Sequence, residues 1–154
     1  MKYWLMKSEP DVYGIDHLRA EKRKTDHWDG IRNYQARNFI RDEMNKRDLA
    51  FFYHSNCEEP AVVGVMEIVS EAYPAHTAYL PDAQYFDPKS DPENPRWLMV
   101  DVKFKEKFKT PVTLKAMKQE KALAKMRLVQ RGTRLSILPV TAKEWKYILE
   151  LAGA

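Results

Sequence analysis

Apolar and polar positions along the chain follow two periods, and the two-residue period marks five short strands. In the clearest of them, Val100, Val102 and Phe104 alternate with polar residues, which is typical of a strand with one buried face. Two β-prone runs separated by the turn SNCEEP (residues 55–60) predict an antiparallel hairpin. The predicted strands span residues 2–7, 49–54, 61–69, 97–108 and 134–139.

Helices are predicted where apolar residues recur every three or four positions. A helix from Asn33, a favourable N-cap residue, to about residue 45 buries one stripe. The stripe comprises Ala36, Phe39, Ile40 and Met44. Thr141 and Glu144 have the spacing of a capping box for a final helix. Shorter helical stretches are predicted within 11–20 and 114–128.

Strands at the start, middle and end of the chain, with helices between them, indicate an α+β fold. We expect a small, mostly antiparallel, barrel-like sheet with flanking helices, in which the first and last strands meet. The 154 residues suit a single domain over 1–154, and no internal repeat interrupts it. Five prolines within residues 74–96 predict a long irregular excursion, a kind of segment that is often functional.

Composition narrows the class of protein. Cys57 is the single cysteine, so the chain forms no internal disulfide and fits a reducing, cytoplasmic location. No apolar run approaches the roughly 20 residues of a membrane span, and we expect no membrane partner. The scattered histidines and lone cysteine predict no metal site, and we expect no cofactor.

Charge is segregated along the chain. Residues 56–101 carry nine acidic and two basic side chains, whereas residues 103–134 carry eleven basic and two acidic ones. Such a division can create a basic face that attracts nucleic-acid phosphates. A solvated lysine-rich surface is the other reading of the same pattern.

Three polar groups sit where predicted strands begin or end. Lys7, Ser8 and Glu9 follow the first strand, and Tyr53, His54 and Ser55 form the hairpin tip. Arg134 and Ser136 lie in the last strand. Such side chains can hydrogen-bond the edge of a base. Alternatively, the first two groups are ordinary polar turns, and Arg134 is a surface residue with Ser136 bonded to the backbone.

The most distinctive segment is HWDGIRN, residues 27–33, ahead of the second predicted helix. We place Trp28 in a loop, where its indole could stack on a base, and Gly30 allows close backbone approach. Arg32 and Asn33 stand at a helix start, which favours phosphate. Alternatively, Trp28 fills the core and Asn33 only caps the helix.

The chain resembles the EVE domain family in five motifs that occur in order along nearly its whole length. These are YWLMKSEP (3–10), WDGIRNYQARNF (28–39), FFYHSN (51–56), YFDPKSDPENPRWLMVDVKF (85–104) and RLSILPV (134–140). The resemblance implies a PUA-like fold related to the YTH domain, which holds methyladenine of RNA in an aromatic cage. It also implies a non-enzymatic module that binds DNA or RNA carrying a modified base, with modified cytosine in DNA among the ligands.

Carried over motif by motif, the resemblance assigns roles to individual residues. Lys7, Ser8 and Glu9 would lie at the pocket mouth, and Trp28 would stack on the base. Gly30, Ile31, Arg32 and Asn33 would form the adjoining wall, Tyr53, His54 and Ser55 another side, and Arg134 and Ser136 would reach in. Trp97, from the family stretch 94–97, would support the barrel.

Two other functions fit the residues. An RNA-processing nuclease could use Lys7, Glu9, Tyr53 and His54 as acid and base groups. A protein-interaction module could use the acidic segment 56–101.

Overall fold

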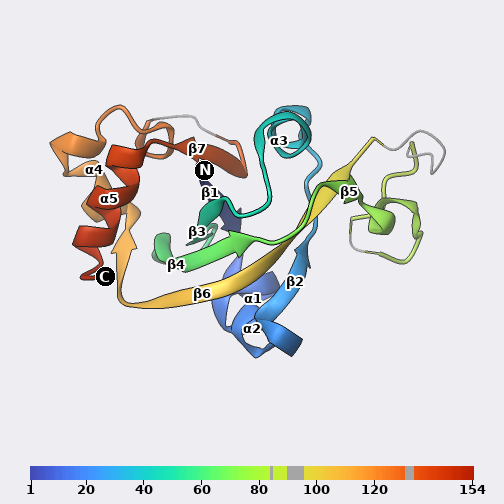
Figure 1. Cartoon of the computed structure of the whole chain (residues 1–154), viewed down its shortest axis with the longest axis horizontal. Helices are drawn as coiled ribbons and strands as arrows, with labels where there is room; N and C mark the ends of the chain where they lie inside the picture. The colour runs from blue at the N-terminus through green and yellow to red at the C-terminus, as the bar shows by residue number, and fades with distance from the viewer. Residues whose placement is uncertain (84, 90–95, 131–133) are drawn as a thin grey trace.

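A mixed β-sheet organises the chain, and its strands follow the alternation seen in the sequence. The computed structural model describes residues 1–154 except 84, 90–95 and 131–133. Within the described residues the sheet has seven strands in the order β2-β6-β4-β3-β1-β7, with β5 paired to β6 (Figure 1). The strands are β1 (Tyr3–Ser8), β2 (Thr25–Trp28), β3 (Leu49–His54), β4 (Ala61–Ile68), β5 (Tyr73–Pro74), β6 (Leu98–Thr113) and β7 (Ile137–Val140).

Helical segments connect and flank the strands. They are α1 (Pro10–Tyr13), α2 (Ile15–Ala20), η1 (Lys22–Lys24), α3 (Tyr34–Asn38), η2 (Phe39–Glu43), η3 (His76–Tyr79), α4 (Leu114–Lys118), η4 (Lys121–Leu123), η5 (Arg127–Val129) and α5 (Ala142–Leu151). The predicted helix from Asn33 is confirmed, although its second half, η2, is a π-helical turn. In Figure 1, α4 and α5 lie at one end of the molecule and η3 lies at the other.

The α+β class and the mostly antiparallel sheet are confirmed, but closure into a barrel is not. Of the six strand pairings among described residues, five are antiparallel and only β1 with β3 is parallel. β1 pairs with β7, as expected for the first and last strands. The two edges, β2 and β7, are not paired with each other in the described part of the chain, so the sheet is open.

Two hydrophobic cores form on opposite faces of the strands, because successive side chains of a strand point to opposite sides. Trp4 and Met6 of β1 belong to the first core, with Trp28, whereas Leu5 belongs to the second. The second core contains Trp145 of α5. That helix begins with the predicted capping box, in which the Thr141 hydroxyl accepts from the Glu144 N–H at 3.1 Å.

The parallel register of β1 with β3 brings two of the polar groups together. Lys7 is opposite Tyr53 and Ser8 is opposite His54, so both strands end at the same edge. The Ser55 N–H donates to the Ser8 carbonyl at 2.9 Å and continues this pairing beyond the strands. The first and third motifs of the sequence are therefore neighbours in space.

Candidate functional site

A cavity of about 620 Å³ opens where the two edges of the sheet fail to meet. Residues of β2, at one edge, and Ser136, just before β7 at the other, line the same space. Its size is within the range of small-molecule sites. The lining residues are Lys7, Ser8, Glu9, Val12, Tyr13, Asp26, His27, Trp28, Asp29, Gly30, Ile31, Ser55, Tyr85, Arg134 and Ser136.

Most of the site residues expected from the sequence meet in this cavity. Those that line it are Lys7, Ser8, Glu9, Trp28, Gly30, Ile31, Ser55, Arg134 and Ser136. They come from four separate stretches of the chain, which only the tertiary fold brings together. Arg134 and Ser136 precede β7, so their predicted place within the last strand is wrong, although both still face the cavity.

Trp28 combines the two readings that the sequence left open. It is 5% exposed and packs edge-on against Phe52, with ring centroids 5.2 Å apart, so it belongs to the first core. It also lines the cavity, so the residue borders both the core and an open space. The predicted loop position is wrong: Trp28 ends strand β2 and pairs with Val100 of β6. That strand is short and polar, and it forms because the long β6 offers it a partner.

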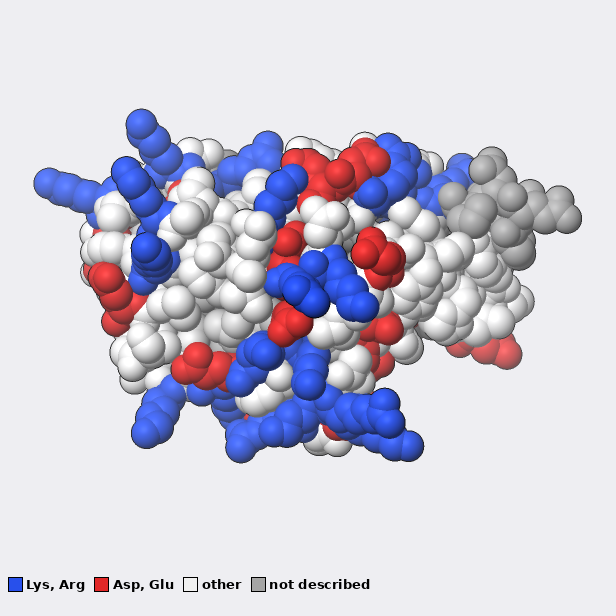
Figure 2. Space-filling model, in the orientation of Figure 1, with Lys and Arg blue, Asp and Glu red and all other residues white. Residues whose placement is uncertain are grey.

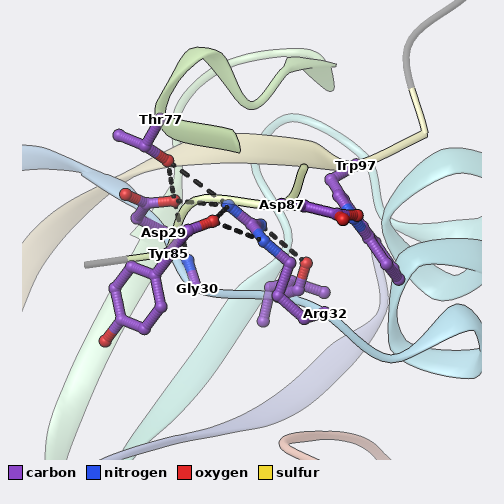
Figure 3. A network of polar contacts seen from close by, with 8 residues as sticks. Asp29, Gly30, Arg32, Thr77, Tyr85, Asp87 and Trp97 are labelled. Carbon is purple, nitrogen blue, oxygen red and sulfur yellow. Dashed lines mark hydrogen bonds and ion pairs between the residues drawn. The ribbon is translucent and has the colours of Figure 1, made fainter. Parts of the chain in front are cut away.

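Arg32 is not part of the cavity lining; it binds the segment that approaches the cavity from the far end of the molecule. Its Nε and Nη2 donate to the Tyr85 carbonyl oxygen at 3.0 and 2.6 Å, and Nη1 donates to the Ile31 carbonyl at 2.9 Å (Figure 3). Burial lowers the pKa of Arg32, and nearby Asp29 opposes that shift. Phosphate binding by Arg32 is therefore not what this geometry favours.

Asn33, Tyr53 and His54 also lie outside the lining. The Asn33 side chain accepts from the Ala36 N–H at 3.0 Å, which is the capping alternative. Tyr53 is buried in the second core, and burial raises its pKa to about 12. His54 Nε2 accepts from the Ile15 N–H at 3.1 Å, and burial lowers its pKa. The acid and base groups of the nuclease alternative are thus divided, since only Lys7 and Glu9 line the cavity.

Six lining residues were not among the residues expected from the sequence. They are Val12, Tyr13, Asp26, His27, Asp29 and Tyr85. His27 and Asp29 lie within the segment HWDGIRN, but neither was expected from the sequence to contact a ligand. Tyr85 lies in the proline-rich excursion, whose functional character the prolines had indicated. Tyr13 and Asp26 carry no signal in the sequence, because only the tertiary fold brings them to the cavity.

The cavity contains both hydrogen-bond donors and acceptors. Burial lowers the pKa of Lys7, whereas burial and nearby Asp26 raise that of Tyr13, which keeps its hydroxyl protonated. The Asp29 carboxylate accepts from the Gly30 N–H and from the Thr77 hydroxyl, both at 2.7 Å. A carboxylate can accept about four hydrogen bonds, so Asp26 and Asp29 retain capacity for a ligand.

Trp97 packs in a third hydrophobic cluster with Ala75, Ala78 and Met99, and not in the core of a barrel as the family resemblance implied. Its Nε1–H donates to Asp87 at 2.6 Å, and its ring stacks on Tyr34 at 4.9 Å, away from the cavity lining. Asn94 and Pro95, from the same family stretch, lie outside the described residues.

The described ranges contain neither a candidate metal site nor a candidate membrane span. No three His, Cys, Asp or Glu side chains there group in a way that could hold a metal ion. None of the helices described is both long and apolar enough to cross a bilayer.

Comparison with known proteins identifies the family to which this open-sheet α+β fold belongs. The EVE domain family model matches residues 2–151, and the chain belongs to that family. Thymocyte nuclear protein 1 of Homo sapiens is 44% identical over an alignment 166 positions long, and this alignment covers 97% of this chain and 73% of the human protein.

Solved structures agree with this assignment. The crystal structure of human THYN1 in complex with 5-methylcytosine containing DNA superposes with a TM-score of 0.94 at 42% identity, covering 100% of this chain and 99% of that one. A protein from Pseudomonas syringae gives a TM-score of 0.93 at 47% identity, covering 97% and 99% of the two chains.

Proposed function

We propose that this protein binds DNA and holds a modified cytosine, 5-methylcytosine first of all, in the cavity beside Trp28. The observation that carries the proposal is the cavity itself, which is bordered by an indole and by polar groups from both edges of the sheet. The human relative crystallised with DNA containing 5-methylcytosine supports this ligand class. The protein acts as a binding module and leaves the nucleic acid chemically unchanged.

Access to a cavity of this kind requires that the base leave its stack. Extruding a base from a duplex costs a few kcal/mol. Stacking on an aromatic side chain contributes about 1–3 kcal/mol per base, so contact with Trp28 offsets part of that cost. A mismatched or single-stranded base costs less to extrude and should enter more readily.

The polar lining suits cytosine because carboxylates of the cavity can accept hydrogen bonds from the exocyclic amine of the base. Carboxylates accept hydrogen bonds from cytosine N4, and Asp26 and Asp29 both line the cavity. Lys7 and the hydroxyl of Ser136 can donate to ring and carbonyl acceptors, whereas the Ser8 hydroxyl already donates to the Tyr13 carbonyl at 2.6 Å. In this arrangement the amine of the base donates to the aspartates, and the ring nitrogen and carbonyl oxygen of the base accept from Lys7 and Ser136.

The methyl group adds only modest discrimination. Burying one methyl contributes about 0.8 kcal/mol, which corresponds to roughly a fourfold preference for 5-methylcytosine over cytosine. A larger ratio requires that the plain base leave a polar group unpaired or a space unfilled. The expected preference in binding is therefore severalfold unless such a penalty operates.

The first prediction concerns the aromatic face of Trp28. Trp28→Ala would open a core cavity costing about 3–5 kcal/mol, so Trp28→Leu and Trp28→Phe are the better pair. They fill similar space, but only phenylalanine keeps a ring. We expect the leucine variant to bind a methylated oligonucleotide about 5- to 150-fold more weakly, and the phenylalanine variant to retain most of the affinity.

Binding titrations measure the affinity of each variant. They use matched DNA duplexes, single strands and RNA, each with and without the methyl group. Thermal unfolding of each variant separates loss of binding from loss of the fold. Equal affinity of the leucine variant and the wild type would show that the indole does not contact the base. Cleavage of the recovered nucleic acid would instead favour the enzymatic alternative.

A further inference from the structure

The ring of Tyr85 occupies the space that a side chain at position 30 would need. Gly30 has a φ of +84°, and a Cβ built there would lie 2.7 Å from Tyr85 Cζ and 2.8 Å from Cε1. Real Cβ atoms essentially never approach so closely, so glycine at this position allows the ring to lie directly on the backbone. Both residues line the cavity, which makes this contact part of its wall.

Polar contacts hold the Tyr85 segment in that position. Two N–H groups of Arg32 converge on the Tyr85 carbonyl oxygen, and the Asp29 carboxylate accepts from the Thr77 hydroxyl (Figure 3). Hydrogen bonds from a charged guanidinium are roughly twice as strong as those between neutral groups. Arg32 also lies 5.9 Å from the centre of the Tyr85 ring. The stretch 29–32 therefore fixes a segment about fifty residues further along the chain.

On this geometry, we propose that Tyr85 is a second aromatic residue that contacts the bound base, with Arg32 as its positioning residue. The inference rests on the proposed function and deepens it, because it adds the ring of Tyr85 to that of Trp28 at the end of β2. Arg32 acts through Tyr85, because its donors face the Tyr85 and Ile31 carbonyls and it is not among the lining residues. Burial, with Asp29 and Glu9 nearby, raises the pKa of Tyr85, so its hydroxyl stays neutral.

The same contacts predict how the residues depend on one another. Gly30→Ala should displace the ring, and Arg32→Lys should release the carbonyl while keeping the positive charge that attracts DNA. Both substitutions should therefore weaken base binding through Tyr85. Once Tyr85 is replaced, Arg32→Lys should have little further effect, because the residue it positions is gone.

The test measures affinity for a duplex with a single 5-methylcytosine and for the free nucleoside 5-methyldeoxycytidine. Tyr85→Ala and Tyr85→Leu should each weaken both by about 5- to 150-fold. Tyr85→Phe should stay within about threefold, because it keeps the ring. Phe86→Ala is the matched control, since Phe86 is the exposed neighbour outside the cavity lining, and its affinity should equal that of the wild type.

Four outcomes decide between the possibilities. A loss for Tyr85→Ala and Tyr85→Leu but not Phe86→Ala, with unchanged melting temperature, supports the inference. Wild-type affinity in both Tyr85 variants overturns it while leaving the proposed function intact. A wild-type protein with no preference for methylated DNA overturns the proposed function itself. In the double variant, an Arg32→Lys effect as large as that in the wild type would show that Arg32 acts independently of Tyr85.

Discussion

His54 illustrates, at the scale of a single residue, how a polar strand end can serve the fold. Its Nε2 accepts the hydrogen bond of the Ile15 N–H at the start of α2, and burial lowers its pKa below the ordinary value of 6.5. Asp16 opposes that shift, whereas Lys107 and His17 reinforce it. Protonation of Nε2 would place a donor against a donor and break this contact.

The pH dependence of stability follows from that lowered pKa. Below about pH 6.5 the unfolded chain binds a proton at His54 that the folded protein resists, so the free energy of unfolding should decrease as pH falls. His54→Gln keeps a hydrogen-bond acceptor that does not titrate, so the variant should not show the part of the pH dependence that comes from His54. His76→Gln, at an exposed histidine, should retain it. Denaturant unfolding between pH 5 and 8 tests this, and parallel curves for wild type and His54→Gln would contradict it.

The roles of individual residues are where the sequence was least informative. The hairpin tip offered Tyr53, His54 and Ser55 as equivalent polar groups, yet only Ser55 lines the cavity. A strand alternates its faces, and the sequence does not say which face meets which core. Arg32 was expected at the ligand and instead binds a carbonyl in a loop whose path no local pattern encodes.

At the scale of elements, two helix caps of similar chemistry lie at different distances from the site. Asn33 caps α3 directly after the stretch that lines the cavity, whereas Thr141 caps α5 in the second core. Replacing either by alanine should cost about 1 kcal/mol and lower the melting temperature by about 2–4 °C. Only Asn33→Ala should also weaken DNA binding, because it loosens the backbone at Gly30 and Ile31.

Calorimetry and a binding titration on both variants provide the measurement. Thr141→Ala serves as the control for a general loss of stability. If both variants bind equally well, α3 does not position the site, and if both lose affinity, the effect comes from stability alone.

Periodicity located most elements correctly, including the hairpin of β3 and β4 and the capped α5. It missed β2, because a polar four-residue strand has no pattern of its own and depends on pairing with β6. The predicted barrel-like closure of the sheet was also wrong. Whether two edges pair is decided by tertiary packing, and here the unpaired edges border the cavity that the site uses.

For the whole molecule, the distribution of charge governs attraction to DNA. The net charge is +4, and Figure 2 shows Lys and Arg side chains spread over several parts of the surface. Lys105 pairs with Glu67 at 3.0 Å and Lys107 with Asp16 at 2.8 Å, so part of the basic stretch is neutralised within the protein. Basic residues at the cavity should therefore matter more than their number along the chain suggests.

Salt dependence measures this difference. The logarithm of DNA affinity should fall linearly with the logarithm of salt concentration, with a slope of about −0.9 per phosphate contacted. Arg134→Gln, at the cavity, should make the slope shallower by about 0.9, whereas Lys118→Gln, on α4, should leave it unchanged. Equal changes for the two variants would place the phosphate contacts elsewhere.

A crystal structure of the protein with a duplex containing one 5-methylcytosine is the most direct test of the account. We expect the methylated nucleotide to be rotated out of the helix, with its ring between the two edges of the open sheet and in contact with Trp28. A methylated base still stacked in the duplex, with the cavity empty in the complex, would contradict the central claim.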